Sequence, residues 1–461
     1  MNYSEKLFET QGAIRLENSI DAFFSDFQVG RLLNVAGIRK MRGASPLKVF
    51  AAIFRLPFEG KNFYRGIVEQ DGLGFGKDAA YALLRNPRHN WRRLMRGLAV
   101  KIAAVFSLLT DEEREKVLIF DSSTYDRSRS KKVELLAWIF DHTVGKSLRG
   151  FSLLTLGWSD GFSFIPLDFV LGSSANEKSR IQEAEKLIDK RTCGHQRRLE
   201  AVCKATDLLE TMIKRVLAAG IDADYILMDS WFSFPAIIVT LSRHCPVICM
   251  LKNMPQVFYK YGGRWYTLGG LYALLKKRPG QARILAAVNV ETKQGPQVRI
   301  VFVRHRHKRD WLAVLSTKVD LPDKEIVRIY GKRWDIEVCF KMLKQHLRLE
   351  KEAQLRDYDG LVGHVTVVMI RYMFLSFRQR LHSDQRTAGS LFHACCEEVR
   401  DLILLEAMQR LMTLMIDKIR STGELAEDVI SKMIDAMMGA MADIMETIRR
   451  SHNKKFGIAE S

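Results

Sequence analysis

Five residues at regular spacing give the strongest chemical signal in this sequence. They are Tyr330, Arg333, Glu337, Lys341 and Lys344, separated by 3, 4, 4 and 3 positions in a segment with helical patterning. At about 100° per residue, this spacing places all five side chains within one stripe of a helix. A face with one carboxylate, several cations and a phenol suits a metal ion held beside phosphates. The pattern also fits an ordinary surface helix whose Glu pairs with Arg and Lys one turn away.

Two aspartates directly follow short apolar runs. Asp121 ends the run Val-Leu-Ile-Phe, and Asp229 ends the run Tyr-Ile-Leu-Met. Runs of this length are typical of strands that are buried on both faces. The carboxyl ends of such strands form the edge at which open α/β sheets bind ligands. An Asp after a strand is also often only the N-cap of a helix, and three neighbouring aspartates compete for the same roles: Asp126, Asp222 and Asp224.

Asp121, Asp229 and Glu337 together could hold two Mg²⁺ ions. Hard divalent cations prefer carboxylate oxygens and usually keep several waters. Two ions about 3.5–4 Å apart clamp the attacking and leaving oxygens of a phosphoryl displacement. Arg333 would then orient the phosphate through two hydrogen bonds, and Lys344 would act as a point charge. The sequence therefore predicts phosphoryl-transfer chemistry.

The charge of the chain indicates a long anionic partner. Among 461 residues there are 72 Lys+Arg against 53 Asp+Glu, a formal charge of +19 that is spread along the sequence. A spread positive field suits DNA better than a small anion, although charge can also serve solubility alone. The hydrophobic fraction of 47% excludes a chain that is disordered as a whole. Seven scattered cysteines, no evident signal peptide and no apolar run of bilayer length predict a cytoplasmic protein without a membrane segment.

Hydrophobic periodicity predicts an α/β fold between two helical regions. Residues 1–112 read as helical, with a helix start at Ser45 and Pro46. Their basic cluster at 85–93 includes Trp91; it could contact DNA phosphates and stack on bases, or be a solvated helix face with one core Trp. Strand patterns at 117–121, 151–158, 162–171, 225–229 and 246–251 predict a sheet within 113–254. Residues 255–320 read as a β-rich insertion, with a hairpin at Gly262 and Gly263, and 321–354 and 355–461 as helical.

These motifs resemble the Asp-Asp-Glu insertion-sequence transposases, in the group with a Tyr-(2)-Arg-(3)-Glu-(6)-Lys signature that includes the transposon-five enzyme. Tyr330, Arg333, Glu337 and Lys344 meet that spacing without a gap. Asp121, in Phe-Asp-Ser-Ser-Thr-Tyr, is similar to the first Asp motif of the family. The sequence Met-Asp-Ser-Trp-Phe around Asp229 is similar to the second. The resemblance covers about residues 115–350.

The resemblance implies an RNase H-like catalytic core, interrupted by a β-rich insertion and flanked by helical N- and C-terminal regions. Asp121, Asp229 and Glu337 would be the catalytic metal ligands for two Mg²⁺ ions, with Mn²⁺ as a substitute. Tyr330, Arg333 and Lys344 would contact DNA phosphates near the cut. Trp311 would stack on a flipped base, unless it is an ordinary β-core aromatic.

The implied activity is cut-and-paste transposition in the bacterial cytoplasm, at the nucleoid. The partners would be double-stranded DNA, namely the terminal inverted repeats of the element and the target, and a second copy of the chain in a synaptic homodimer. Residues 1–112 would bind the element ends, 113–254 and 321–354 would form the core, and 355–461 would dimerise. Two alternatives are an RNase H-like nuclease that cuts without joining and a catalytically idle, DNA-binding descendant of a transposase.

Overall fold

The computed structural model describes residues 19–422, apart from short gaps, and a few isolated positions up to 447. The gaps are 40–42, 71, 111–113, 142–143, 186, 294, 296, 306–309 and 382–387. The chain divides into two compact units, one of Met1–Phe23, Phe58–Gly60 and Ser390–Ser461, the other of Phe24–Pro57 and Lys61–Gly389. The second unit carries all the residues singled out in the sequence. The predicted helical segment at the C-terminus lies outside the described residues for most of its length beyond Thr422.

The described residues of the predicted helical region 1–112 are helical, as predicted, and residues 1–18 lie outside the described part of the chain. Ser45 caps α4 by accepting a hydrogen bond from the backbone N–H of Lys48, and Pro46 stands at the first helical position. Asn90 caps α6 in the same way by accepting from the N–H of Arg93. The helices are α2 (Ser19–Asp26), α3 (Val29–Val35), α4 (Pro46–Arg55), the π-helix η1 (Tyr64–Val68), α5 (Lys77–Arg85) and α6 (Trp91–Leu108).

One mixed sheet forms the core of the larger unit. Its strands lie in the order β2-β3-β1-β5-β6-β11-β10-β9-β7-β8, and β4 pairs with β3 beside this path. β1, β5 and β6 are parallel neighbours, and all other pairs are antiparallel. The strands are β1 (Val117–Asp126), β2 (Ala137–Asp141), β3 (Lys146–Ser159), β4 (Phe164–Gly172), β5 (Tyr225–Met228), β6 (Val247–Leu251), β7 (Phe258–Tyr261), β8 (Arg264–Thr267), β9 (Ile284–Thr292), β10 (Gln297–Arg304) and β11 (Trp311–Ser316). The predicted α/β class is confirmed.

The β-rich segment continues the core sheet instead of forming a sheet of its own. β11 pairs antiparallel with β6, with Leu315 opposite Cys249. The segment also contains the short helix α10 (Leu268–Leu274), which periodicity did not reveal. Strand β2 was missed as well. It is an edge strand with alternating exposure, and Trp138 and Phe140 are both half exposed.

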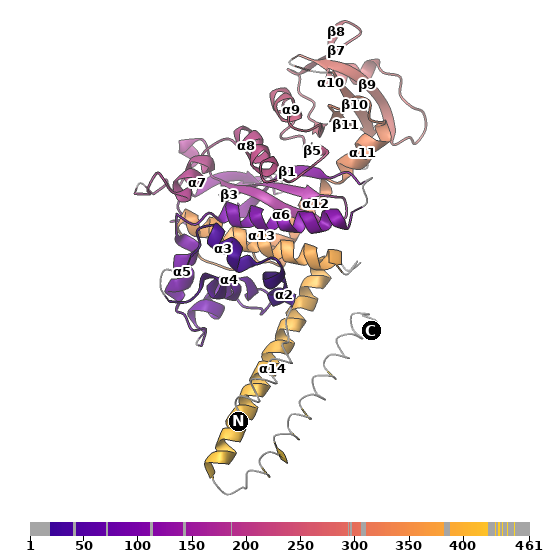
Figure 1. The fold of residues 1–461 in the computed structure, drawn as a ribbon. Coiled ribbons are helices and arrows are strands. Elements are labelled where there is room, and N and C mark those ends of the chain that lie inside the picture. Colours follow the sequence, from indigo (N-terminus) through magenta and orange to yellow (C-terminus); the bar gives the residue numbers. More distant parts are fainter. Residues whose placement is uncertain are drawn as a thin grey trace. The chain divides into compact units, whose positions relative to one another are not determined.

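Helices cover both faces of the sheet (Figure 1), with α6, α12 and α13 on one face and α7 and α8 on the other. α13 is long and apolar enough to cross a membrane, but its apolar window is completely buried within the protein, as in a core helix. The remaining elements are the 3-10 turn η2 (Glu177–Ser179), α7 (Cys193–Ala201), α8 (Ala205–Leu217), α9 (Pro235–Ser242), α11 (Asp323–Gly331), α12 (Trp334–Gln345), α13 (Tyr358–Leu381) and α14 (Ala388–Thr422).

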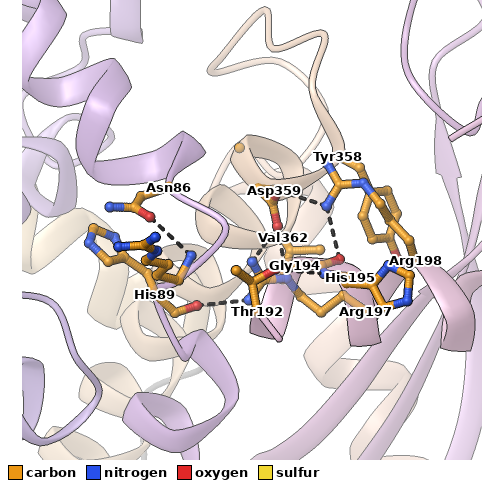
Figure 2. A network of polar contacts seen from close by, with 12 residues as sticks. Asn86, His89, Thr192, Gly194, His195, Arg197, Arg198, Tyr358, Asp359 and Val362 are labelled. Atoms are coloured by element: carbon orange, nitrogen blue, oxygen red, sulfur yellow. Dashed lines mark hydrogen bonds and ion pairs between the residues drawn. The ribbon is translucent and has the colours of Figure 1, made fainter. Parts of the chain in front are cut away.

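A buried polar network ties α7 to the start of α13 (Figure 2). Arg197 and Arg198 both reach Asp359, with 2.7 Å from Arg198 Nη1 to Asp359 Oδ2. The guanidinium of Arg198 also meets Glu134 at 2.6 Å, and that of Arg197 donates to the carbonyl of His89 at 2.8 Å. Buried charges of this kind are stable only while they are paired. The network therefore fixes the loop before α6 against two helices.

The basic cluster at 85–93 is partly internal. Trp91 is fully buried, so the idea that it stacks on DNA bases is wrong. Arg92 pairs with Asp168 at 2.8 Å and with Glu200 at 2.6 Å, which joins α6 to β4 and α7. Trp91 is the first residue of α6, which packs on the sheet, so its indole is part of the hydrophobic core.

Candidate active site

Neighbouring parallel strands bring the two aspartates together. In the register of β1 and β5, Phe120 lies opposite Met228, and each is followed by an aspartate, Asp121 and Asp229. Parallel neighbours are about 4.8 Å apart. The two aspartates therefore lie side by side where the parallel pairing of β1 with β5 ends. Asp229 follows the last residue of β5 as predicted, whereas β1 continues to Asp126, so Asp121 does not end its strand as the apolar run predicted.

The segment that carries the third acid is not one uninterrupted helix, which corrects the expected single stripe. α11 ends at Gly331 and α12 begins at Trp334. Between them the backbone N–H groups of Lys332 and Arg333 donate three residues back, to Ile329 and Tyr330, both at 3.0 Å. Such bonds tighten a turn to 3-10 form, and glycine weakens helix propensity there. Arg333 keeps right-handed helical dihedrals, so the chain continues in nearly the same sense.

Arg333 joins the first and third acids. Its Nη1 lies 3.0 Å from Oδ2 of Asp121, and its other terminal nitrogen contacts Oε1 of Glu337. The acids of β1 and α12 thus meet across one guanidinium. Asp229 is close enough to interact electrostatically with Arg333 and with both other acids. The structure therefore gathers all three predicted carboxylates in one place, although they are far apart in the chain.

The electrostatics of the cluster show that negative charge is crowded there. Burial, together with the charges of Asp229 and Glu337, raises the pKa of Asp121 from 3.8 to about 6, although Arg333 opposes the rise. Burial also raises the pKa of Asp229, against the backbone N–H of Trp231, which donates to it at 3.0 Å. Desolvated acids beside one another favour a bound cation, because it offsets their repulsion.

The chemistry of the donor set fits hard divalent cations, since every donor is a carboxylate oxygen. No three His, Cys, Asp or Glu side chains among the described residues form a ready-made metal cage as they stand. Asp121 and Glu337 both hold Arg333 in this arrangement.

The other residues of the predicted signature lie along the same two helices. The guanidinium of Arg333 is 6.0 Å from the ring centroid of Tyr330, and burial raises the pKa of that phenol. Lys344, in the last turn of α12, is 3.6 Å from Glu350. Tyr330 and Arg333 thus lie beside the acids, whereas Lys344 pairs with Glu350.

Trp311 begins β11 and packs among aromatic rings of the inserted segment. Its ring stacks on Tyr272 with centroids 4.9 Å apart and meets the edge of Phe302 at 5.2 Å. These contacts are those of a β-core aromatic, the alternative to a base-stacking role.

The rival aspartates have other contacts. Asp224 precedes β5, at its amino end, and accepts from the backbone N–H of Lys116 at 2.7 Å. Asp126 is exposed at the far end of β1 and accepts from Ser128. Asp222 lies beside Asp224 and accepts at its carbonyl from Trp158.

Two exposed indoles near the acids were not proposed from the sequence. Trp231 is 50% exposed two positions after Asp229, and Trp334 is 62% exposed directly after Arg333. The ammonium of Lys252 lies 6.0 Å from the ring centroid of Trp231. Exposed aromatics beside cations can stack on nucleic-acid bases. Their only signal in the sequence is adjacency to the motif residues.

Comparison with known families agrees with this site. A family model described as DDE superfamily endonuclease matches residues 59–254, which include Asp121 and Asp229. A second, described as Transposase DDE domain, matches residues 202–374, which include Asp229 and Glu337. A search of curated proteins found no match. The two matches support a DDE-type transposase, and the large mixed sheet with helices on either side is consistent with the RNase H-like core of such an enzyme.

Proposed function

We propose that this protein is the DNA transposase of an insertion sequence, of the Tyr-Arg-Glu-Lys group. It would bind the ends of the element and catalyse metal-dependent strand cleavage and strand transfer by a cut-and-paste route. The observation that carries the proposal is the convergence of Asp121 and Glu337 on Arg333, next to Asp229. The two family matches, which together span all three acids, support it.

The proposed roles follow from the chemistry of each side chain. Asp121, Asp229 and Glu337 hold two Mg²⁺ ions, or Mn²⁺, which would activate the attacking oxygen and neutralise the leaving one. The guanidinium of Arg333 forms ion pairs with Asp121 and Glu337, and it could instead donate two parallel hydrogen bonds to a phosphate.

The remaining roles concern DNA. Tyr330 and Lys344 contact phosphates near the cut, and Trp311 stacks on a flipped base if its contacts with Tyr272 and Phe302 can open. Residues 1–112 recognise the terminal repeats, 255–320 form the insertion, and 355–461 pair two copies in a synaptic homodimer. We place this reaction in the bacterial cytoplasm, at the nucleoid.

A cleavage and joining assay tests the proposal. Purified protein is incubated with a duplex carrying candidate element ends and with a target plasmid, in Mg²⁺ or in EDTA. We expect Mg²⁺-dependent nicks at the ends, followed by joined products. The Glu337→Gln variant should bind the ends but not cut, because the amide removes one anionic metal ligand. The matched control is Glu325→Gln, an acid on the preceding helix that pairs with Arg328 and should cut normally.

The outcomes separate the alternatives. Cutting without joined products would favour a nuclease, and binding without cutting in Mg²⁺ would favour an idle descendant. Normal cutting by the Glu337→Gln variant would refute the assignment of the acids.

A further inference from the structure

A large basic cavity lies beyond the proposed catalytic residues. Its volume is about 850 Å³, and its walls are the segment 126–133 at the end of β1 and the segment 350–356 between α12 and α13. Six cations line it, against two acids, Asp126 and Glu350. The cations are Arg127, Arg129, Lys131, Lys132, Lys351 and Arg356.

Most of these cations are available to a ligand. All except Arg127 are exposed. None of these five forms an ion pair within the described part of the chain, whereas Arg92, Arg197 and Arg198 are held by buried acids. Unpaired cations concentrated in one cavity produce a local positive potential that attracts anions.

The two walls are fixed to each other. Arg127 is 8% exposed, and its Nη1 donates to the carbonyl of Ala353 at 3.2 Å, while its Nε has no hydrogen-bond partner in the described structure. The backbone N–H of Glu134 donates to the carbonyl of Arg356 at 2.8 Å, and that of Asp126 donates to Glu350 at 3.3 Å. The cavity is therefore a built feature that joins two distant segments.

The cavity is connected to the proposed catalytic residues along both walls. Asp121 and Asp126 belong to the same strand, β1. Five residues of extended chain span about 17 Å at 3.4 Å per residue. On the other wall, the carboxylate of Glu350 lies 3.6 Å from the ammonium of Lys344, the last residue of the Tyr-Arg-Glu-Lys signature.

We propose that this cavity holds the phosphate backbone of the bound DNA duplex, about five base pairs from the phosphate that is cut, since one strand carries a phosphate every 3.4 Å or so of helix axis. A small anion is usually held by convergent buried donors, but five of these six cations are exposed, as in contacts that position a duplex without reading its sequence. The position relative to the cut rests on the proposed function. The binding of a DNA backbone does not.

Binding measurements in EDTA, where no cutting occurs, test the surface. The double variant Lys131→Gln/Lys132→Gln should bind an element-end duplex more weakly. The slope of log K against log salt should become shallower by roughly 2, because each lost phosphate contact removes about 0.9. The variant Lys131→Arg/Lys132→Arg should behave as wild type. A matched control is Lys204→Gln/Lys214→Gln, two exposed lysines near the two ends of α8 and outside the cavity, which should leave the slope unchanged. An unchanged slope in the first variant, or an equal loss in the control, would overturn the proposal.

Duplexes with single neutral methylphosphonate linkages test the position. A neutral linkage about five base pairs from the cut should weaken binding to wild type, and the effect should disappear in the Lys131→Gln/Lys132→Gln variant. An effect that is unchanged in the variant, or that is absent at this distance, would overturn the placement. Failure of the proposed function would be seen separately, as a wild-type protein that never cuts in Mg²⁺ while these binding slopes still respond to the lysines.

Discussion

Replacing Asp121 by Asn should stabilise the metal-free protein near neutral pH. The side chain is only 15% exposed, and burial, Asp229 and Glu337 together raise its pKa from 3.8 to about 6 although Arg333 opposes them. The folded protein therefore tolerates an ionised Asp121 less well than the unfolded chain does. Asn is nearly isosteric and neutral, so it removes this penalty while it keeps the shape of the site.

The size of this stabilisation, and the pH range over which it develops, follow from the pKa of Asp121. A rise of about 2 units corresponds to roughly 3 kcal/mol of free energy of unfolding. Because the folded state binds the proton more tightly, the stability of wild type falls as the pH rises from 3.8 to about 6 and then levels off. The Asn variant lacks this fall. It should be more stable than wild type by up to about 3 kcal/mol at pH 7, and the difference should shrink as the pH falls toward 4.

Denaturant unfolding in EDTA between pH 4 and 8 measures this difference. The control is Asp224→Asn, which replaces an exposed aspartate at the opposite end of β5. Its free energy of unfolding should not rise relative to that of wild type above pH 5. Mg²⁺ should then stabilise wild type more than Asp121→Asn, because binding to the folded state alone adds stability. Parallel curves of the free energy of unfolding against pH for wild type and Asp121→Asn would refute the interpretation that burial and the neighbouring acids raise the pKa of Asp121.

Three further changes test other parts of the structure. Arg333→Met removes the cation that lowers the pKa of Asp121, so the pH of half-maximal Mg²⁺-dependent cutting should move upward, and Arg333→Lys should move it less; no movement would contradict the pairing. Trp311→Ala should lower the melting temperature and Trp311→Phe should largely restore it, since the ring is packed on its neighbours; loss of DNA processing with unchanged melting would instead favour base stacking. Arg371→Met removes the guanidinium that pairs with Glu352 at 2.6 Å in the core, where both side chains are fully buried, and leaves that carboxylate beside the imidazole of His364 at 3.3 Å; it should destabilise by about 3–5 kcal/mol in denaturant unfolding. Adding Glu352→Gln should recover part of that loss, and full additivity would contradict a buried pair.

Local rules were enough to find most of the strands and the two aspartates, although the edge strand β2 was missed. Apolar runs ending in Asp121 and Asp229 are short-range patterns, and so is the helix start at Ser45. Whether Trp91 is buried or exposed depends on which side of α6 packs against the sheet, and no local sequence pattern determines that side. The link between Asp121 and Glu337 through Arg333 is likewise a tertiary contact, visible only once β1 and α12 are packed.

The break between α11 and α12 is a feature that the periodicity of side chains cannot predict. The spacing of Tyr330, Arg333 and Glu337 fits one helix, and Gly331 is a weak signal that many intact helices tolerate. Two bonds of three-residue span shorten the turn without reversing it. The side chains therefore remain near one another even though the helix is not continuous. A spacing motif can thus survive a change in the backbone that carries it.

The inserted strands explain how a residue more than a hundred positions after Asp229 returns to its side. β11 pairs with β6, and β6 with β5, so the chain leaves the insertion three strand spacings, about 14 Å, from β1. α11 then packs on β11 and β6, and α12 reaches β1. Because the return is made through backbone hydrogen bonds of the same sheet, the position of Glu337 is set by the register of β11 against β6. A change of that register by one residue would turn every side chain of β11 to the other face, and with it the start of the path that brings Glu337 to Arg333 and Asp121.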